Sequence, residues 1–118
     1  MSHPRHRIHG YSIEESIEGI VSELEYDAVG MWQIVPKGRD GFGLEGDELM
    51  RFVRRHIEAL LKQGALPVRG VTGENIWIVQ KDYGDTIEDV AESIIQEWLE
   101  SGQDPDVGGL WFALPDQI

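Results

Sequence analysis

Residues 47–63 constrain the fold most, because their apolar members recur at the spacing of an amphipathic helix. Acidic residues begin this stretch, Lys62 lies in its last turn, and Gly64 follows where a left-handed residue commonly ends a helix. One side of the predicted helix carries Leu49, Met50, Val53, Ile57, Leu60 and Leu61. The other side carries Arg51, Arg54, Arg55, Glu58 and Lys62. We therefore expect a helix that buries one face and presents a basic stripe on the other.

Two further helices are predicted from the same period of apolar residues. The first opens at Ser12, which has the spacing of a capping box with Glu15, and it runs to Leu24. The second is capped by Thr86, or by Asp85 with Glu88 three residues later, and runs to Ser101. Both helices carry an apolar stripe on one side and mostly acidic residues elsewhere. Each is therefore expected to pack one face against a core.

Short runs of β-branched and aromatic residues, separated by turn residues, predict four strands. These strands are residues 28–35, 66–69, 75–80 and 109–114. The segment 36–46 contains four glycines and is predicted to be a loop. The element order is then helix, strand, helix, strand, strand, helix, strand.

This order predicts an α+β fold of the ferredoxin-like βαββαβ type, preceded by an extra N-terminal helix. In that fold the first and third strands are central, and Pro67 in the second strand agrees with a position at the sheet edge. We expect residues 12–118 to form a single α+β domain. Residues 1–11 are expected to be a flexible N-terminal tail.

The composition excludes several classes of protein. A chain of 118 residues with 41% hydrophobic content is long and apolar enough to fold as one domain. It has no cysteine, which excludes disulfides and thiolate chemistry and suits a reducing compartment. Its apolar runs are too short to span a membrane, and no secretory signal is expected at the N-terminus. We expect a cytoplasmic protein without a membrane partner and without a cofactor.

The charge is strongly negative and unevenly distributed. The chain carries a net charge of −12, and from Asp82 to the end it has ten acidic residues and no Lys or Arg. Between Lys37 and Arg69 the balance is instead +2, with seven basic and five acidic residues. Such a chain repels phosphate backbones, so nucleic acid is not an expected partner. A basic partner protein is favoured, although high solubility alone would also explain the charge.

Three tryptophans share one parity in the predicted strands, so they should lie on one face of the sheet. They are Trp32, Trp77 and Trp111. This face is the one that the two crossover helices would leave bare, and a bare apolar face needs a cover. The N-terminal helix is the first candidate for that cover, a second copy in a homodimer is another, and a ligand is a third.

A glycine-rich segment matches the pattern G-x-G-x-x-G before a helix, as in some phosphate-binding loops. The candidate phosphate-binding residues are Lys37, Arg39, Gly41, Gly43 and Gly46. Asp47 and Glu48 stand where the phosphate charge would lie, and no acidic residue follows at the distance a ribose would need. A plain connector is the favoured interpretation.

Other motifs carry weaker signals. His3, His6 and His9 are spaced by three and could gather around a metal, but a plain tail is favoured and no metal site is predicted. His56 is a lone helical histidine, and no Ser or Asp at a fixed spacing from it marks a catalytic triad. The basic stripe of Arg51, Arg54 and Arg55 could dock an acidic surface, although a solvated face on which Glu58 pairs with Arg54 or Lys62 is favoured.

Two functional hypotheses follow. The first is a small, acidic, non-enzymatic module for protein–protein interaction or regulation, such as an inhibitor, that uses its acidic surface or its tryptophan face. The second is a small-molecule-binding or enzymatic α+β domain, with its site at the tryptophan face or at the glycine-rich segment. No catalytic residue is predicted, so an enzyme is the less favoured class.

Overall fold

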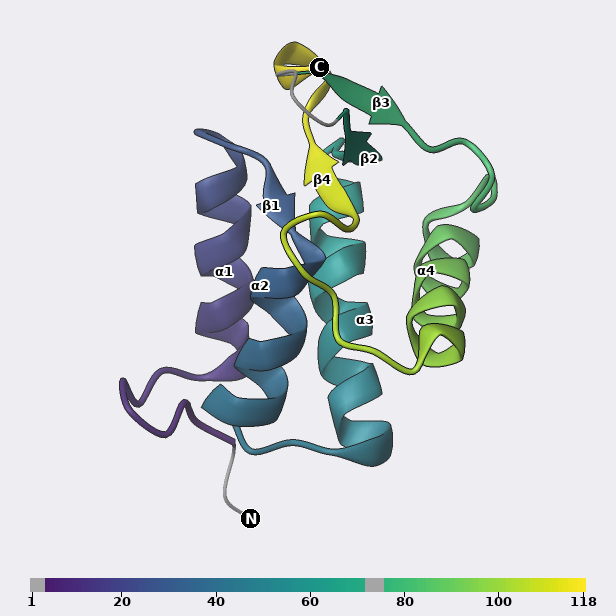
Figure 1. Cartoon of the computed structure of the whole chain (residues 1–118). Coiled ribbons are helices and arrows are strands. Elements are labelled where there is room, and N and C mark those ends of the chain that lie inside the picture. Colours follow the sequence, from purple (N-terminus) through teal and green to yellow (C-terminus); the bar gives the residue numbers. More distant parts are fainter. Residues whose placement is uncertain (1–3, 72–75) are drawn as a thin grey trace.

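The computed structural model describes residues 4–71 and 76–118 of the chain, and it is an α+β protein. The helices are α1 (Ile13–Leu24), α2 (Met31–Pro36), α3 (Gly46–Lys62) and α4 (Ile87–Ser101). A π-helical turn, Lys37–Gly41, continues α2, and a 3₁₀ turn, Pro115–Gln117, ends the chain. The strands are β1 (Val29–Gly30), β2 (Leu66–Gly70), β3 (Trp77–Val79) and β4 (Trp111–Ala113). Figure 1 shows the helices side by side below a small sheet.

The three long helices form where the sequence predicted them, and their ends have the expected chemistry. The Ser12 hydroxyl accepts from the Glu15 amide, and the Ser12 amide donates to the Glu15 carboxylate, each at 3.1 Å. The Thr86 hydroxyl accepts from the Asp89 amide at 3.0 Å, and Gly102 ends α4 in the left-handed conformation. Such caps satisfy amide groups that have no partner within a helix.

The sheet does not have the predicted ferredoxin-like order. Its strands are antiparallel in the order β1-β4-β2-β3, so the second and fourth strands are central and the first and third are at the edges. Pro67 therefore lies in a central strand, contrary to the prediction. It is tolerated because it lies one residue beyond the last β2–β3 pair, Val68 with Val79, and its carbonyl accepts from the Gln80 amide at 2.8 Å. A missing N–H at the end of a ladder costs little.

The prediction of a strand over residues 28–35 was wrong beyond its first residues. The chain pairs with β4 through Val29 and Gly30 and then turns into α2. The Gln33 side chain accepts from the Gly30 amide at 2.7 Å, which caps the new helix. Met31, Ile34 and Val35 are all buried, and their spacing of three and four residues is that of a helix face.

The prediction of a loop over residues 36–46 was also wrong in its first half. Pro36 has no amide hydrogen to continue the α-helical ladder, and a π-helical turn follows it, in which the Phe42 amide donates to the Lys37 carbonyl at 3.0 Å. Gly38 lies against Phe52 of α3, where a Cβ would come within 2.7 Å of the ring. This glycine thus permits close packing of two helices instead of a flexible connection.

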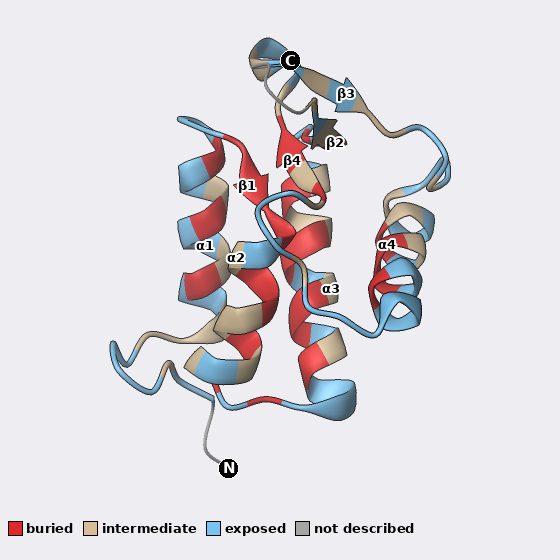
Figure 2. Ribbon diagram, viewed as in Figure 1, coloured by how far each residue is buried: buried red, intermediate tan, exposed pale blue. Residues whose placement is uncertain are grey.

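The main core lies between α1, α2 and α3 and reaches α4 and the nearer side of the sheet (Figure 2). Its α1 members include Ile20 and Leu24, which pack with the α3 side chains. From the sheet, Val29 and Phe112 join this core. Because these two residues are directly paired, they define the sheet face that the helices cover.

The N-terminal segment folds back over the glycine-rich segment. Arg5 forms an isolated bridge with Ser12, and the Arg7 amide donates to the Gly41 carbonyl at 2.7 Å. The flexibility expected for residues 1–11 stays a prediction. Within the part of the chain that the structure describes, no helix is long and apolar enough to cross a membrane.

Candidate functional site

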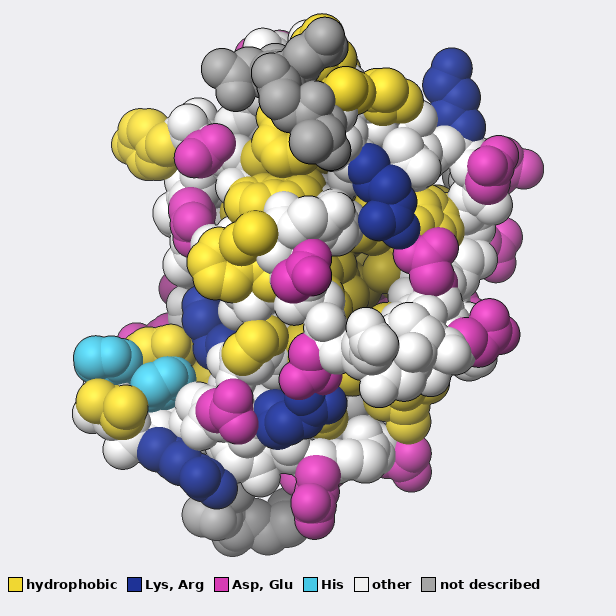
Figure 3. Space-filling view, in the orientation of Figure 1, with side chains coloured by type: hydrophobic (Ala, Val, Ile, Leu, Met, Phe, Trp, Pro, Cys, Tyr) yellow, Lys and Arg dark blue, Asp and Glu magenta, His cyan; other side chains and the backbone are white. Residues whose placement is uncertain are grey.

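Trp32, Trp77 and Trp111 lie together on the sheet face opposite the helices, and we call them the tryptophan surface. Trp111 is the middle ring: its centroid is 5.4 Å from that of Trp77 and 6.3 Å from that of Trp32. Trp77 and Trp111 share a face because each pairs with a residue of β2 on that face. Figure 3 shows hydrophobic side chains gathered over this end of the molecule, with acidic side chains at their margin.

Trp32 reaches the tryptophan surface by a route that the sequence did not predict. It projects from the first turn of α2, and Gly30 allows it to lie close to the backbone of β1. A Cβ at Gly30 would come within 2.5 Å of the Trp32 ring and 3.1 Å of the Trp111 ring. The edge-to-face contact of Trp32 with Trp111 therefore depends on a glycine.

A second, smaller apolar cluster forms the floor of the tryptophan surface. Its buried members are Ala28, Val68 and Ala113, and Trp77, Val79 and Trp111 pack over them. Trp32 keeps 37% of its surface exposed, and Trp77 and Trp111 are half-buried. The Trp111 indole N–H donates to the Val107 carbonyl at 2.9 Å, which fixes this ring against the loop before β4.

Helix α1 does not cover the tryptophan surface, contrary to the first candidate for that cover. Its buried residues Ile20 and Leu24 belong to the main core, and its principal contacts are with α3. Trp77 and Trp111 belong to a separate cluster, and all three tryptophans stay partly open. An apolar sheet face without a cover from α1 is a candidate site for binding.

Two arginines of the basic stripe on α3 form ion pairs with neighbouring helices. Arg54 pairs with Glu92 of α4, and Arg55 pairs with Glu14 of α1 at 3.3 Å. Among the residues that the structure describes, Glu58 pairs with neither of its two predicted partners, Arg54 and Lys62. Arg51 is exposed beside Arg55 at a concavity between α1 and α3. Two of the three cations connect helices, which leaves little of the stripe for a partner.

The two basic residues of the glycine-rich segment have different surroundings. Arg39 pairs with Asp104, and burial lowers the pKa of Lys37. Gly43 and Gly46 have positive φ angles and shape the turn into α3. Gly41 lies under His6, and Gly43 lies beside the Arg7 guanidinium. The N-terminal segment thus occupies the space beside these backbone groups.

His6 and His9 stack with a centroid distance of 5.0 Å, and His3 lies outside the described residues. The Nδ1 atom of His6 accepts from the amides of Ile8 and His9, each at 3.2 Å. Among residues 4–71 and 76–118, no three His, Cys, Asp or Glu side chains are grouped so that they could hold a metal.

His56 has a serine partner that sequence spacing could not reveal. Its Nδ1 lies 2.7 Å from the Phe52 carbonyl, which can only accept, so Nδ1 carries the hydrogen. Its Nε2 lies 2.8 Å from the Ser16 Oγ and therefore accepts from the hydroxyl. Both side chains are buried, and burial lowers the pKa of His56 to about 4. The pair resembles a catalytic dyad in its hydrogen bonds, but it lies inside the core between α1 and α3.

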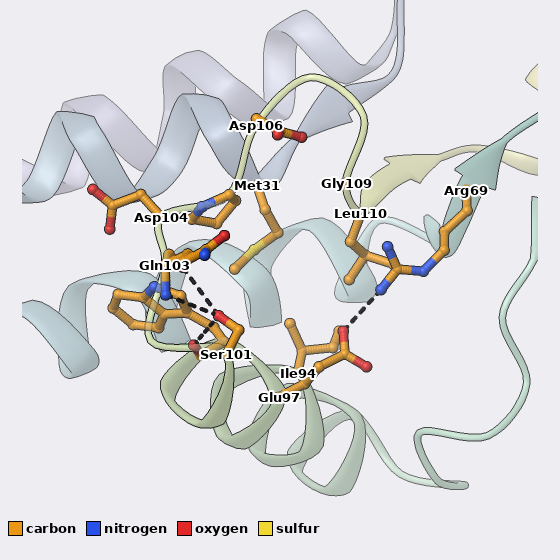
Figure 4. Close-up of a pocket in the computed structure, with 12 residues that line it drawn as sticks. Met31, Arg69, Ile94, Glu97, Ser101, Gln103, Asp104, Asp106, Gly109 and Leu110 are labelled. Carbon is orange, nitrogen blue, oxygen red and sulfur yellow. Dashed lines mark hydrogen bonds and ion pairs between the residues drawn. The ribbon is translucent and has the colours of Figure 1, made fainter. Parts of the chain in front are cut away.

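A pocket of about 290 Å³ lies between the end of α4 and the loop before β4 (Figure 4). Met31, Ile94 and Leu110 provide apolar walls, and Asp104 and Asp106 stand at its loop side. The Arg69 guanidinium closes one end by donating to the Glu97 carboxylate at 2.9 Å. This ion pair was missed because Arg69 and Glu97 come from elements far apart in the sequence.

No family model, curated protein or solved structure matches this chain. The function therefore has to be inferred from the chemistry of its surface.

Proposed function

We propose that this protein is an acidic, non-enzymatic binding module that binds a basic segment of another protein at the tryptophan surface. The observation that carries this proposal is the contact among Trp32, Trp77 and Trp111 on a sheet face that α1 leaves open. Tryptophan is enriched in the central contacts of protein interfaces, because it combines a large apolar area with few rotatable bonds.

The charge of the protein favours a basic partner. A net charge of −12 attracts a cationic segment over a longer range than the contacts themselves. Lysine and arginine are also attracted to the face of an indole ring. The same net charge opposes a second copy as the occupant, because two acidic surfaces would have to approach one another. A homodimer is therefore less favoured than a basic partner at the open face.

The buried position of Ser16 and His56 supports a non-enzymatic function. These two side chains have 3% and 0% of their surface exposed, so a substrate cannot reach the hydroxyl without an opening of the core. A small-molecule site at the glycine-rich segment has little support, because residues of the N-terminal segment lie over Gly41 and Gly43.

Fluorescence anisotropy with a labelled peptide of alternating lysine and valine tests the proposal. We expect saturable binding that weakens as salt is added and that is absent for the matching glutamate–valine peptide. Trp77→Ala should weaken binding by at least about tenfold, since aromatic contacts of this kind contribute roughly 2 kcal/mol or more at an interface. Leu99→Ala is the matched control, because Leu99 is 44% exposed on α4 and belongs to neither apolar cluster.

Equal affinity of the Trp77→Ala variant and the wild type would contradict binding at the tryptophan surface. Equal affinity for the two peptides would contradict a basic partner. Light scattering checks the competing occupant: a stable dimer that dissociates in the Trp77→Ala variant would assign the surface to a second copy.

A further inference from the structure

Strand β3 leaves one edge of the sheet open beside the tryptophan surface. It pairs with β2 on one side, and no strand of residues 4–71 or 76–118 pairs with its other side. Figure 1 shows β3 at the far end of the sheet, away from α1 and β1. Open edges present unpaired backbone groups that can pair with another chain, and proteins usually shield them.

The pairing with β2 fixes which backbone groups of β3 face outward. The Val71 amide donates to the Ile76 carbonyl at 3.1 Å, and the Gln80 amide donates to the Pro67 carbonyl at 2.8 Å. Hydrogen-bonded pairs alternate along an antiparallel ladder. The N–H and C=O of Ile78 therefore point to β2, and those of Trp77 and Val79 point to the open edge. Each of these two residues therefore offers one N–H and one C=O outward.

The two faces beside this edge differ in chemistry. Trp77 and Val79 lie on the face of the tryptophan surface. Ile78 lies on the other face and is 52% exposed. Beyond it, on the Arg69 side of the sheet, is a concavity of about 460 Å³ between the end of β3 and α4. Its acidic lining residues are Asp82, Glu92, Glu97 and Glu100.

Two of these four carboxylates already have cationic partners, and two do not. Glu92 pairs with Arg54, and Glu97 pairs with Arg69 and also accepts from the Tyr83 hydroxyl at 2.8 Å. Asp82 and Glu100 are exposed and have no ion pair with any residue that the structure describes. The concavity thus keeps negative charge that a cation can neutralise.

We propose that the basic partner segment binds as an extended strand, antiparallel to β3, with apolar side chains toward the tryptophan surface and basic side chains toward the acidic concavity. This inference rests on the proposed function and gives it a recognition mode, addition of a strand to a sheet edge. The antiparallel direction continues the pairing of all the existing strands. A second copy is a poor occupant of the same edge, since two chains that each carry a net charge of −12 repel one another.

The geometry predicts which peptide amides are needed. Directly opposed residues of an antiparallel hydrogen-bonded pair exchange both bonds, and their side chains lie on the same face. The peptide residues that bond to Trp77 and Val79 are therefore those whose side chains face the tryptophans, which are the apolar ones. The amides of the basic residues point to solvent.

Methylation of alternate amide nitrogens in the lysine–valine peptide tests this mode on the unaltered protein. Methylation of every valine amide should weaken binding by at least about tenfold, because it removes the donors to the carbonyls of Trp77 and Val79. Methylation of every lysine amide leaves the same composition and charge, and it should leave the affinity within about twofold of the parent peptide.

The outcomes separate the two proposals. Equal affinity for both methylated peptides and the parent, with binding still lost in Trp77→Ala, would overturn strand addition and leave the proposed function standing. Loss with lysine methylation alone would also overturn the antiparallel arrangement. An unmethylated peptide that does not bind at all would contradict the proposed function itself, and strand addition of this peptide with it.

Discussion

The Ser16 hydroxyl donates a hydrogen bond to the Nε2 atom of His56 at 2.8 Å, and this bond joins α1 to α3 inside the core. The other ring nitrogen donates to the Phe52 carbonyl, so both nitrogens of the buried imidazole are satisfied. Buried polar groups are costly when their partners are removed, and a satisfied pair favours one packing of the two helices. The pair is therefore a structural connection whose removal should be measurable.

Ser16→Ala should lower the free energy of unfolding by about 1–3 kcal/mol, because it leaves Nε2 of His56 buried without a donor. Ser22→Ala is the matched control, since Ser22 is exposed on the same helix and should change the free energy by less than about 0.5 kcal/mol. Urea denaturation of both variants gives the comparison. Two equal, small effects would show that the hydrogen bond contributes nothing.

Stability should fall as the pH falls from about 6.5 to 4. Desolvation of His56, with smaller effects from Lys37 and Arg55, lowers its pKa to about 4 in the folded protein, below the ordinary value of 6.5. The unfolded chain therefore binds the proton more tightly, and the stabilisation present above pH 6.5 is lost through this window, by up to about 3 kcal/mol in total. An NMR titration of the His56 ring provides the direct measurement. A midpoint near 6.5 would be inconsistent with a buried, neutral imidazole.

Two glycine-to-alanine substitutions should change stability in opposite directions. Gly38→Ala should destabilise the fold by about 1–3 kcal/mol, because the new methyl group would come within 2.8 Å of Leu49 as well as 2.7 Å of Phe52. Gly19→Ala should stabilise it by roughly 0.5–1 kcal/mol, since Gly19 lies in α1 with nothing within 4 Å of its Cβ position. Thermal denaturation tests both. Tolerance of alanine at Gly38 would argue against the packing of the π-helical turn on α3.

We predict no useful affinity for nucleic acid at physiological ionic strength. The net charge is −12, and Arg54 and Arg55 of the basic stripe are already paired with carboxylates. A gel-shift assay at about 150 mM salt with duplex and single-stranded probes measures this. Sub-micromolar binding to either probe would refute the prediction.

The long helices could be predicted because period, caps and charge all indicate the same elements. The secondary structure of residues 28–41 could not be predicted, since a short apolar run is consistent with either a strand or a helix turn. The burial of Met31, Ile34 and Val35 shows that the helical spacing was present in the sequence. It was obscured by the β-branched and aromatic composition of the run.

The sheet order and the cover of the tryptophans depend on contacts between distant segments, which local patterns do not encode. Parity placed Trp77 and Trp111 on one face, and the register confirms this. Trp32 joins them from a helix instead of a strand, through space left by Gly30. The pairs Ser16–His56 and Arg69–Glu97 join separate elements and could not have been identified by spacing.

The most direct test of the account is an NMR titration of the tryptophan indole N–H signals with the lysine–valine peptide. Trp98 is an internal control, because it is 9% exposed in the main core and lines the pocket of Figure 4 instead of the tryptophan surface. The account predicts that the signals of Trp77 and Trp111 shift in a saturable way and that the Trp98 signal stays in place. Shifts confined to Trp98, or no indole shift when the peptide is in large excess, would contradict it.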